Sequence, residues 1–81
     1  MDVFKSNKYK ECFKKLPPLI KSKIIKIIKQ LKKSLLRVEL VKGYNDTYRC
    51  RIDDDYFFVF LLDGQSCILL FAGKNEEDFT K

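Results

Sequence analysis

Arg49 and Arg51, two arginines separated by a single residue, form a basic pair of a kind that can bind phosphate. They lie in residues 47–52, whose β-branched and aromatic side chains favour a strand. Successive side chains of a strand point to opposite faces, so the arginines share one face while Cys50 and Ile52 share the other. Two guanidinium groups about 7 Å apart on a rigid sheet could each hold a phosphate bidentately. Exposed strands often carry such pairs merely as solvated residues, so the pattern alone leaves both interpretations open.

The sequence contains no histidine. The commonest general base and the commonest metal ligand are therefore absent, which excludes a Ser-His or Cys-His hydrolase and a His-ligated zinc enzyme. The three cysteines, Cys12, Cys50 and Cys67, follow no metal-binding spacing, and two of them lie inside apolar runs. We expect inert, reduced thiols, and we expect no metal and no cofactor.

The net charge of +6 is unevenly distributed along the chain. Residues 1–35 contain eleven lysines and two acidic residues, whereas residues 36–81 contain six basic and nine acidic residues. A basic surface of this size attracts polyanions such as RNA or DNA, or an acidic protein partner. The alternative interpretation is that the lysines only solvate the outer faces of helices.

Helical spacing of apolar residues predicts two helices in the basic half. The first covers residues 6–16, with Ser6 or Asn7 as N-cap, and the Pro-Pro pair that follows ends it because proline lacks the N–H that a helix needs. The second covers residues 18–33, where isoleucines and leucines form a broad apolar stripe. The Pro-Pro corner should fold the two helices into a hairpin. A basic amphipathic helix could instead lie on a membrane surface, but the chain also offers a sheet for the stripe to cover.

Four segments typical of strands follow, separated by turn signals such as Asp-Gly. They are residues 37–41, 47–52, 56–62 and 66–72, and residues 1–4 could add a short edge strand. The sequence therefore predicts one α+β domain over residues 1–81. In it, an N-terminal helical hairpin packs on one face of a three- to four-stranded antiparallel sheet. No apolar run approaches the ~20 residues that span a bilayer, and residues 1–10 lack an apolar signal core, so we expect a cytoplasmic protein.

The order of motifs in residues 41–79 resembles the RelE/ParE superfamily of toxins from toxin–antitoxin modules. A Val-Lys-Gly turn at residues 41–43 precedes a Tyr-Arg-Cys-Arg-Ile strand at residues 48–52 and an acidic turn at residues 53–55. An aromatic-led apolar strand, an Asp-Gly hairpin and a final apolar strand ending in Gly73 come next, and Phe79 closes the motif. The upstream helical hairpin matches as well, so the resemblance covers nearly the whole chain.

This resemblance implies the toxin of a type II toxin–antitoxin module, which cleaves mRNA on the ribosome without metal or cofactor and has a cognate antitoxin as partner. Arg49 and Arg51 would hold the scissile phosphate and its transition-state charge, and Asp55 would orient or deprotonate the ribose 2′-OH. Tyr56 and Phe79 would stack on bases. Residues near the cleft would add contacts to the RNA backbone or the leaving group: Lys42, Lys74 and Asn75.

The sequence departs from the family pattern at three positions. Phe57 stands where an arginine commonly follows the tyrosine that leads the strand. Asn75 replaces the basic residue or histidine of the C-terminal tail, and Phe79 replaces a closing tyrosine. The YafQ-like branch fits better, because it shares the Asp-Tyr pair before the strand and a closing phenylalanine, but it relies on histidines that this chain lacks.

Without an imidazole, Asp55 is the only candidate for the base, because arginine does not readily release a proton. Two alternatives to a nuclease therefore stay open: a ParE-like toxin that binds gyrase, or a degenerate member that keeps only RNA or protein binding. Three candidate residues also have a structural interpretation, in which Phe79 closes the core, Tyr56 is half-buried in its strand and Asp55 shapes a turn or pairs with Arg51.

Overall fold

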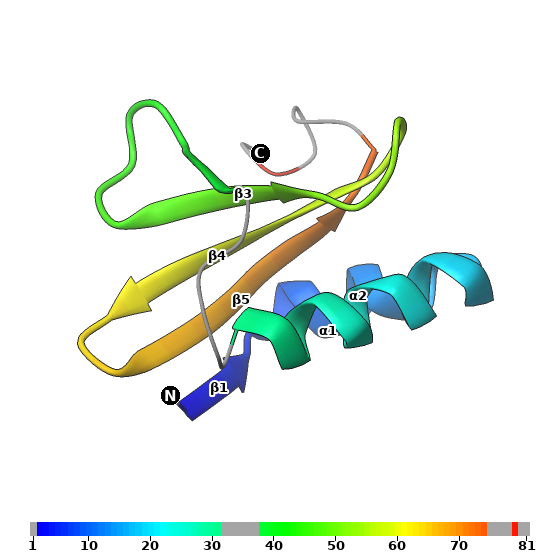
Figure 1. The fold of residues 1–81 in the computed structure, drawn as a ribbon, viewed down its shortest axis with the longest axis horizontal. Coiled ribbons are helices and arrows are strands. Elements are labelled where there is room, and N and C mark those ends of the chain that lie inside the picture. The colour runs from blue at the N-terminus through cyan, green and yellow to red at the C-terminus, as the bar shows by residue number, and fades with distance from the viewer. Residues whose placement is uncertain (1, 32–37, 75–78, 80–81) are drawn as a thin grey trace.

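The structure is a computed structural model that describes residues 2–31, 38–74 and 79 (Figure 1). In chain order its elements are β1 (Asp2–Lys5), α1 (Asn7–Lys14), α2 (Pro18–Leu31), β2 (Val38–Leu40), β3 (Thr47–Arg51), β4 (Phe57–Asp63) and β5 (Ser66–Gly73). This order confirms the predicted α+β fold class. The observed ends lie within one or two residues of the predicted ends wherever the chain is described, and the predicted end of the second helix at residue 33 lies outside the described residues.

The strands of the described chain form one sheet in the order β1-β5-β4-β3-β2. Strands β2 to β5 pair antiparallel with their neighbours, whereas β1 pairs parallel with β5. The sheet is therefore larger than the three to four antiparallel strands predicted, because the optional edge strand at residues 1–4 is present as β1. Its parallel orientation could not be predicted, since its partner strand lies near the other end of the chain and no turn connects the two.

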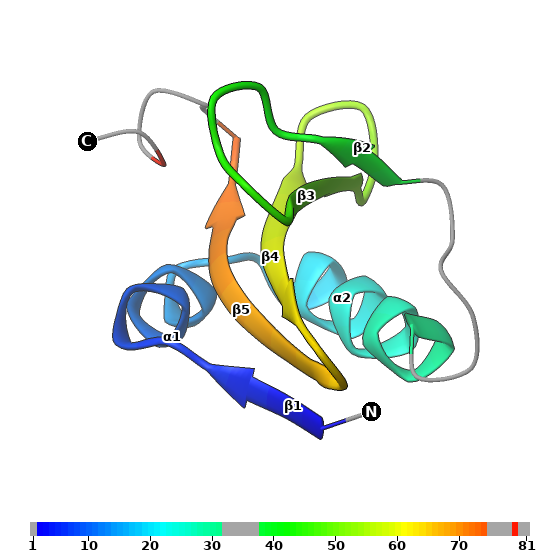
Figure 2. The same cartoon turned by 90° about the vertical axis from the view of Figure 1, so that its left-hand side faces the viewer.

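Ser6 is the N-cap of α1, one of the two caps predicted. Its side-chain oxygen accepts a hydrogen bond from the backbone N–H of Tyr9 at 3.1 Å, which satisfies one of the free donors of the first turn. The same hydroxyl donates to the carbonyl of Leu70 in β5 at 3.3 Å. The cap thus fastens the start of α1 to the sheet, and Figure 2 shows α1 beside β5 with α2 on the β4 side.

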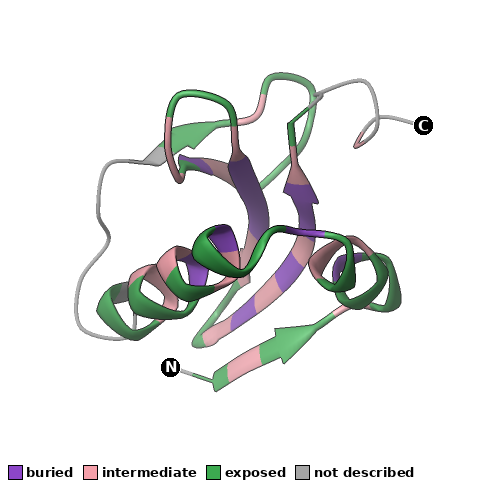
Figure 3. Cartoon of the chain, turned by 90° about the vertical axis from the view of Figure 1, so that its right-hand side faces the viewer, coloured by how far each residue is buried: buried purple, intermediate pink, exposed green. Residues whose placement is uncertain are grey.

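The main core lies between the helices and one face of the sheet (Figure 3). Its buried members are Tyr9, Leu16, Ile20 and Ile24 from the helical part and Cys50, Phe58, Phe60, Cys67, Leu69 and Ala72 from the sheet. The apolar stripe of α2 covers the sheet, as predicted. Both buried cysteines are free thiols, and burial raises the pKa of each, which fits the inert role expected for them.

The opposite face of the sheet carries a second, smaller apolar cluster. Its buried members are Phe57, Val59 and Phe71, surrounded by the partly buried Cys12, Val41, Leu70 and Phe79. In the pairing of β3 with β4, Arg49 lies opposite Val59 and Arg51 opposite Phe57, so both arginines are on this face as predicted. Aromatic rings cover part of this face, so it is not a uniformly polar, solvated surface.

Candidate functional site

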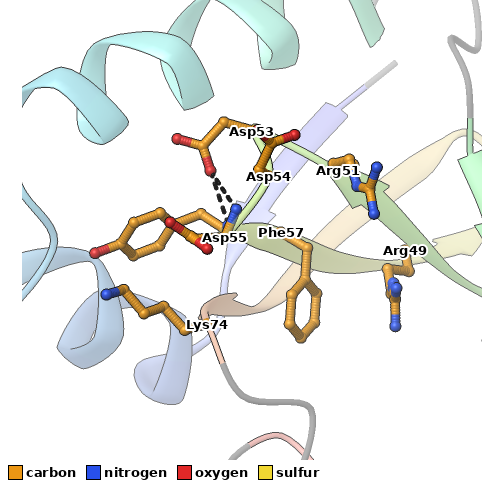
Figure 4. A pocket seen from close by; sticks show the side chains of 8 residues that line it. Arg49, Arg51, Asp53, Asp54, Asp55, Phe57 and Lys74 are labelled. Atoms are coloured by element: carbon orange, nitrogen blue, oxygen red, sulfur yellow. Dashed lines mark hydrogen bonds between the residues drawn. The ribbon is translucent and has the colours of Figure 1, made fainter.

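A pocket of about 220 Å³ lies at the end of the sheet where β3 turns into β4 (Figure 4). Its lining residues are Arg49, Arg51, Asp53, Asp54, Asp55, Tyr56, Phe57 and Lys74. The arginines come from β3, the aspartates and Tyr56 from the β3–β4 turn, Phe57 from the start of β4, and Lys74 from the residue after β5. The structure therefore brings together five of the predicted site residues, namely Arg49, Arg51, Asp55, Tyr56 and Lys74.

Asp53 organises the acidic turn. Its Oδ1 accepts hydrogen bonds from the backbone N–H groups of Asp55 and Tyr56, both at 2.9 Å. Its Oδ2 lies 3.9 Å from the Nζ of Lys23, which connects the turn to α2. The N–H of Asp55, then the N–H of Tyr56 and the charges of Lys23 and Lys74, lower the pKa of Asp53, so this carboxylate is ionised at neutral pH. The sequence interpretation did not single out Asp53, although Asp commonly bonds its own backbone two residues on in a turn.

Asp55 and the two arginines lie on different sides of the pocket. Figure 4 shows Asp55 on the side of Lys74, with Phe57 between them and the arginines. Within the described residues, Asp55 forms no ion pair with Arg51. A bound group must therefore extend across Phe57 to meet both the candidate base and the candidate phosphate ligands.

The two arginines differ in how firmly they are held. The Cζ of Arg49 lies 4.9 Å from the centre of the Phe57 ring, a distance at which a guanidinium and an aromatic face attract each other. Arg49 is half-buried, whereas Arg51 is exposed. Phe57 is only 7% exposed, so it supports Arg49 from beneath and does not offer its ring to the solvent. The sequence had marked Phe57 only as a departure from the family pattern.

Lys74 and Tyr56 form a second contact between a cation and a ring. The Nζ of Lys74 lies 5.1 Å from the centre of the Tyr56 ring, and the Tyr56 side chain also packs against the main core. The half-buried position matches the structural interpretation of Tyr56. A base that stacks on the Tyr56 ring would contact the same ring as Lys74.

Two other candidates, Phe79 and Lys42, are not among the residues that line the pocket. Phe79 packs against Tyr44 and Phe71, with ring centres 5.4 and 5.8 Å away, and its carbonyl accepts a hydrogen bond from the Nζ of Lys8 at 3.0 Å. This position agrees with the structural interpretation, in which Phe79 closes the core. Lys42 is exposed in the turn between β2 and β3. Asn75 lies outside the described residues.

The pocket is electrically balanced, with three basic and three acidic side chains in its lining. A site of this kind can hold a group that presents an anion on one side and hydrogen-bond donors on the other. Despite the three adjacent aspartates, no group of three or more potential ligands in the described residues is arranged to hold a metal ion. In the same part of the chain, no helix has the length and apolar character needed to cross a membrane.

No protein-family model matches the sequence, and no curated protein matches it. Solved structures do match over nearly the whole chain. A chain of the RelB–RelE antitoxin–toxin complex from Methanococcus jannaschii is 21% identical, with a TM-score of 0.79 and 95% of each chain covered. A copper-bound mutant toxin from Helicobacter pylori is 24% identical, with a TM-score of 0.80 and coverage of 95% of this chain and 97% of that one. YafQ from Escherichia coli is 14% identical, with a TM-score of 0.75 and coverage of 96% and 97%.

The chain has the RelE/ParE toxin fold. The resemblance recognised in the sequence is therefore confirmed at the level of the fold, including the helical hairpin upstream of the motif. At these identities the match concerns the RelE/ParE scaffold itself. The activity has to be argued from the side chains that line the pocket.

Proposed function

We propose that this protein is the toxin of a type II toxin–antitoxin module and that it cleaves mRNA on the ribosome. One observation carries the proposal: on a RelE/ParE scaffold, a single pocket contains a pair of arginines, a lysine, a tyrosine and an aspartate suited to be a base. Structures with this scaffold include antitoxin–toxin complexes, which supports the toxin role and an antitoxin partner. A cytoplasmic location follows from that role.

The proposed reaction is transfer of the phosphate to the neighbouring 2′-oxygen. Asp55 takes the proton of the ribose 2′-OH, and the 2′-oxygen attacks the adjacent phosphorus. The bond from phosphorus to the 5′-oxygen breaks, which leaves a 2′,3′-cyclic phosphate and a free 5′-OH. Arg49 and Arg51 stabilise the charge that develops on the non-bridging oxygens. The ammonium group of Lys74, which lines the pocket, donates a proton to the leaving 5′-oxygen.

The layout of the pocket is compatible with one nucleotide lying across Phe57. Its phosphate would lie at the arginines, and its ribose would reach toward Asp55 and Lys74. Lys42 remains a proposed contact to the RNA backbone outside this pocket, and Asn75 remains a proposed contact to the backbone or the leaving group. Phe79 would stack on a base only after leaving its present contacts with Tyr44 and Phe71, which makes it the weakest member of the proposed site.

The basic half of the chain supports a polyanionic or acidic partner. Residues 2–31 contain nine lysines and two acidic residues. An acidic or amphipathic segment of an antitoxin, or ribosomal RNA, would complement that surface.

A second candidate function is binding without cleavage, in a gyrase-binding toxin or a degenerate binding module. The balanced charge of the pocket favours it, since three aspartates offset the attraction of the arginines for phosphate. The location of Asp55 across Phe57 from the arginines favours it as well. A gyrase-binding toxin and a degenerate binding module would both keep the scaffold and lack only the chemical step.

The test is message cleavage in a translating extract, together with growth after induction of the protein alone. We expect growth arrest that co-expression of a small acidic protein from the adjacent reading frame relieves. Cleavage should slow by about 10²–10³-fold in Arg51→Ala or Arg49→Ala, by analogy with loss of an oxyanion donor. Asp55→Asn should also cleave slowly, because an amide cannot take the proton. Asp63→Asn is the matched control, since Asp63 is exposed at the far end of β4.

Two results would contradict the proposal in different ways. If Asp55→Asn and Arg51→Ala cleave as fast as the parent, the assigned residues are wrong. If the parent arrests growth without cutting message, the toxin role stands and the second candidate replaces the nuclease.

A further inference from the structure

Arg49 rests on an aromatic stack that crosses two strands of the sheet. Its guanidinium lies 4.9 Å from the centre of the Phe57 ring. Phe57 in turn contacts Phe71, with ring centres 5.7 Å apart and ring planes 46° apart. Phe57 and Phe71 are 7% and 3% exposed, so the stack is part of the interior on this face of the sheet. Buried rings cannot serve as stacking surfaces for a base, so the contact between Phe57 and Arg49 needs another explanation.

Gly73 makes the position of Phe71 possible. Gly73 pairs with Phe57 across the β4–β5 ladder, and Phe71 lies two residues before it on the same face of β5. A Cβ at position 73 would lie 2.8 Å from the Cζ of Phe71 and 3.3 Å from its Cε2. The Phe71 ring therefore occupies the space above Gly73, where a side chain would normally stand, and supports the ring of Phe57.

We propose that Phe57, supported by Phe71, is a positioning residue that holds the Arg49 guanidinium ready to bind the phosphate of the substrate. The inference rests on the proposed function of the pocket. An arginine side chain has many rotamers, and ordering it on a ligand opposes binding. Stacking restricts Arg49 before the ligand arrives, and the planar guanidinium keeps its outer N–H groups directed away from the ring. Arg51 is exposed and makes no ring contact among those of the described residues.

This assignment explains why Phe57 can stand where the family pattern has an arginine. A third arginine beside the pair would add charge, whereas Phe57 adds order to a charge already present. The stack provides positioning only, since no atom of Phe57 or Phe71 is suited to touch the reacting phosphate.

The decisive comparison uses Phe57→Leu and Phe57→Met, which keep an apolar side chain but remove the ring, and Phe57→Tyr, which keeps the ring. We expect the two ring-free variants to bind a single-stranded RNA oligonucleotide roughly 2- to 5-fold more weakly than the parent, the range that loss of a cation–π contact implies. Phe57→Tyr should bind like the parent. Phe60→Leu is the matched control, because Phe60 is fully buried on the opposite face of the sheet.

Two further measurements separate positioning from general destabilisation. In an Arg49→Ala background, Phe57→Leu should cause no further loss of affinity, since the coupled partner is gone. The NMR signal of the Arg49 Nε–H should be shifted by the Phe57 ring in the parent and in Phe57→Tyr, and should move toward an ordinary arginine value in Phe57→Leu. Folding of each variant is checked by circular dichroism.

Inorganic phosphate serves as a probe that does not depend on RNA cleavage. We expect phosphate to perturb the Arg49 Nε–H signal at lower concentration in the parent than in Phe57→Leu. If phosphate perturbs both equally or neither, or if Phe57→Leu weakens RNA binding equally with and without Arg49, the positioning role is overturned. If phosphate behaves as expected but the parent never cuts message, the nuclease assignment fails while the positioning of Arg49 stands.

Discussion

Replacing Arg49 or Arg51 by lysine should reveal that the two arginines contribute unequally to RNA binding. Lysine keeps the positive charge but loses the planar fork that binds phosphate bidentately and stacks on a ring. Arg49 is half-buried and stacked on Phe57, whereas Arg51 is exposed. We therefore expect Arg49→Lys to weaken RNA binding much more than Arg51→Lys.

The magnitude follows from the contacts that each arginine makes. Loss of a charged hydrogen-bonded contact costs about 1.5–3 kcal/mol, and loss of the contact with Phe57 adds about 0.5–1 kcal/mol. Arg49→Lys should therefore cost about 2–4 kcal/mol, or roughly 30- to 800-fold in affinity. Arg51 and a lysine in its place would each give up about 2 kcal/mol of rotamer freedom on binding, so this cost cancels in the substitution while the charge is kept. Arg51→Lys should then cost only about 0–1 kcal/mol.

Fluorescence anisotropy of a labelled single-stranded RNA at several salt concentrations measures both the affinity and the number of charges involved. Each phosphate contact contributes roughly 0.7 to the slope of log affinity against log salt for single strands. The slope should be unchanged in Arg49→Lys and should fall by about 0.7 in Arg49→Ala. Equal losses in Arg49→Lys and Arg51→Lys, or a larger loss in Arg51→Lys, would refute the view that prior stacking makes Arg49 the dominant ligand.

Three other perturbations test the scaffold and its turn. Ile24→Asp should unfold the chain, because Ile24 is 0% exposed and the substitution would bury an unpaired charge. Ile25→Asp should fold normally, since Ile25 is 48% exposed, and thermal melts followed by circular dichroism distinguish the two variants. The lowered pKa of Asp53 means that its contribution to stability is present above the unfolded pKa and is lost as the pH falls through the lower folded pKa. The parent should therefore lose stability more steeply than Asp53→Asn in acid melts. Gly73→Ala should displace the Phe71 ring at a cost of about 1–3 kcal/mol, and the stiffer unfolded chain should offset about 0.4–1 kcal/mol of it. Urea unfolding should then show that the free energy of unfolding falls by up to about 2.5 kcal/mol.

Local signals were sufficient to predict most of the fold. The apolar stripe of α2, the Pro-Pro corner and the Asp-Gly hairpin each depend on residues close together in the chain, and the structure confirms the elements that they predicted. The parallel pairing of β1 with β5 depends on contacts between opposite ends of the chain. No local pattern encodes that pairing, so the optional edge strand was predicted without its partner or its parallel orientation.

The candidate site was predictable to the extent that its residues are neighbours in sequence. Strand alternation placed Arg49 and Arg51 on one face, and the turn that follows brings Asp55 to the same end of the sheet. Lys74 could be associated with them only through the family resemblance. The role of Asp53 was missed because its hydrogen bonds are directed to the backbone of the turn, which composition alone does not reveal.

Phe57 shows why the charge of a site and its binding strength have to be considered separately. With a phenylalanine in place of an arginine, the three cations of the pocket only balance its three carboxylates. If charge alone decided affinity, the pocket would bind RNA weakly. The register of β3 and β4 changes that conclusion. Arg51 is directly opposite Phe57, yet the ring supports Arg49, the diagonal neighbour, and fixes one guanidinium in advance. A fixed cation loses less freedom on binding than a mobile one, so a neutral residue can compensate for part of the missing charge. Under the proposed function, whether this chain cuts RNA or only binds it depends less on total charge than on how far a nucleotide can reach from the ordered Arg49 to the carboxylate of Asp55.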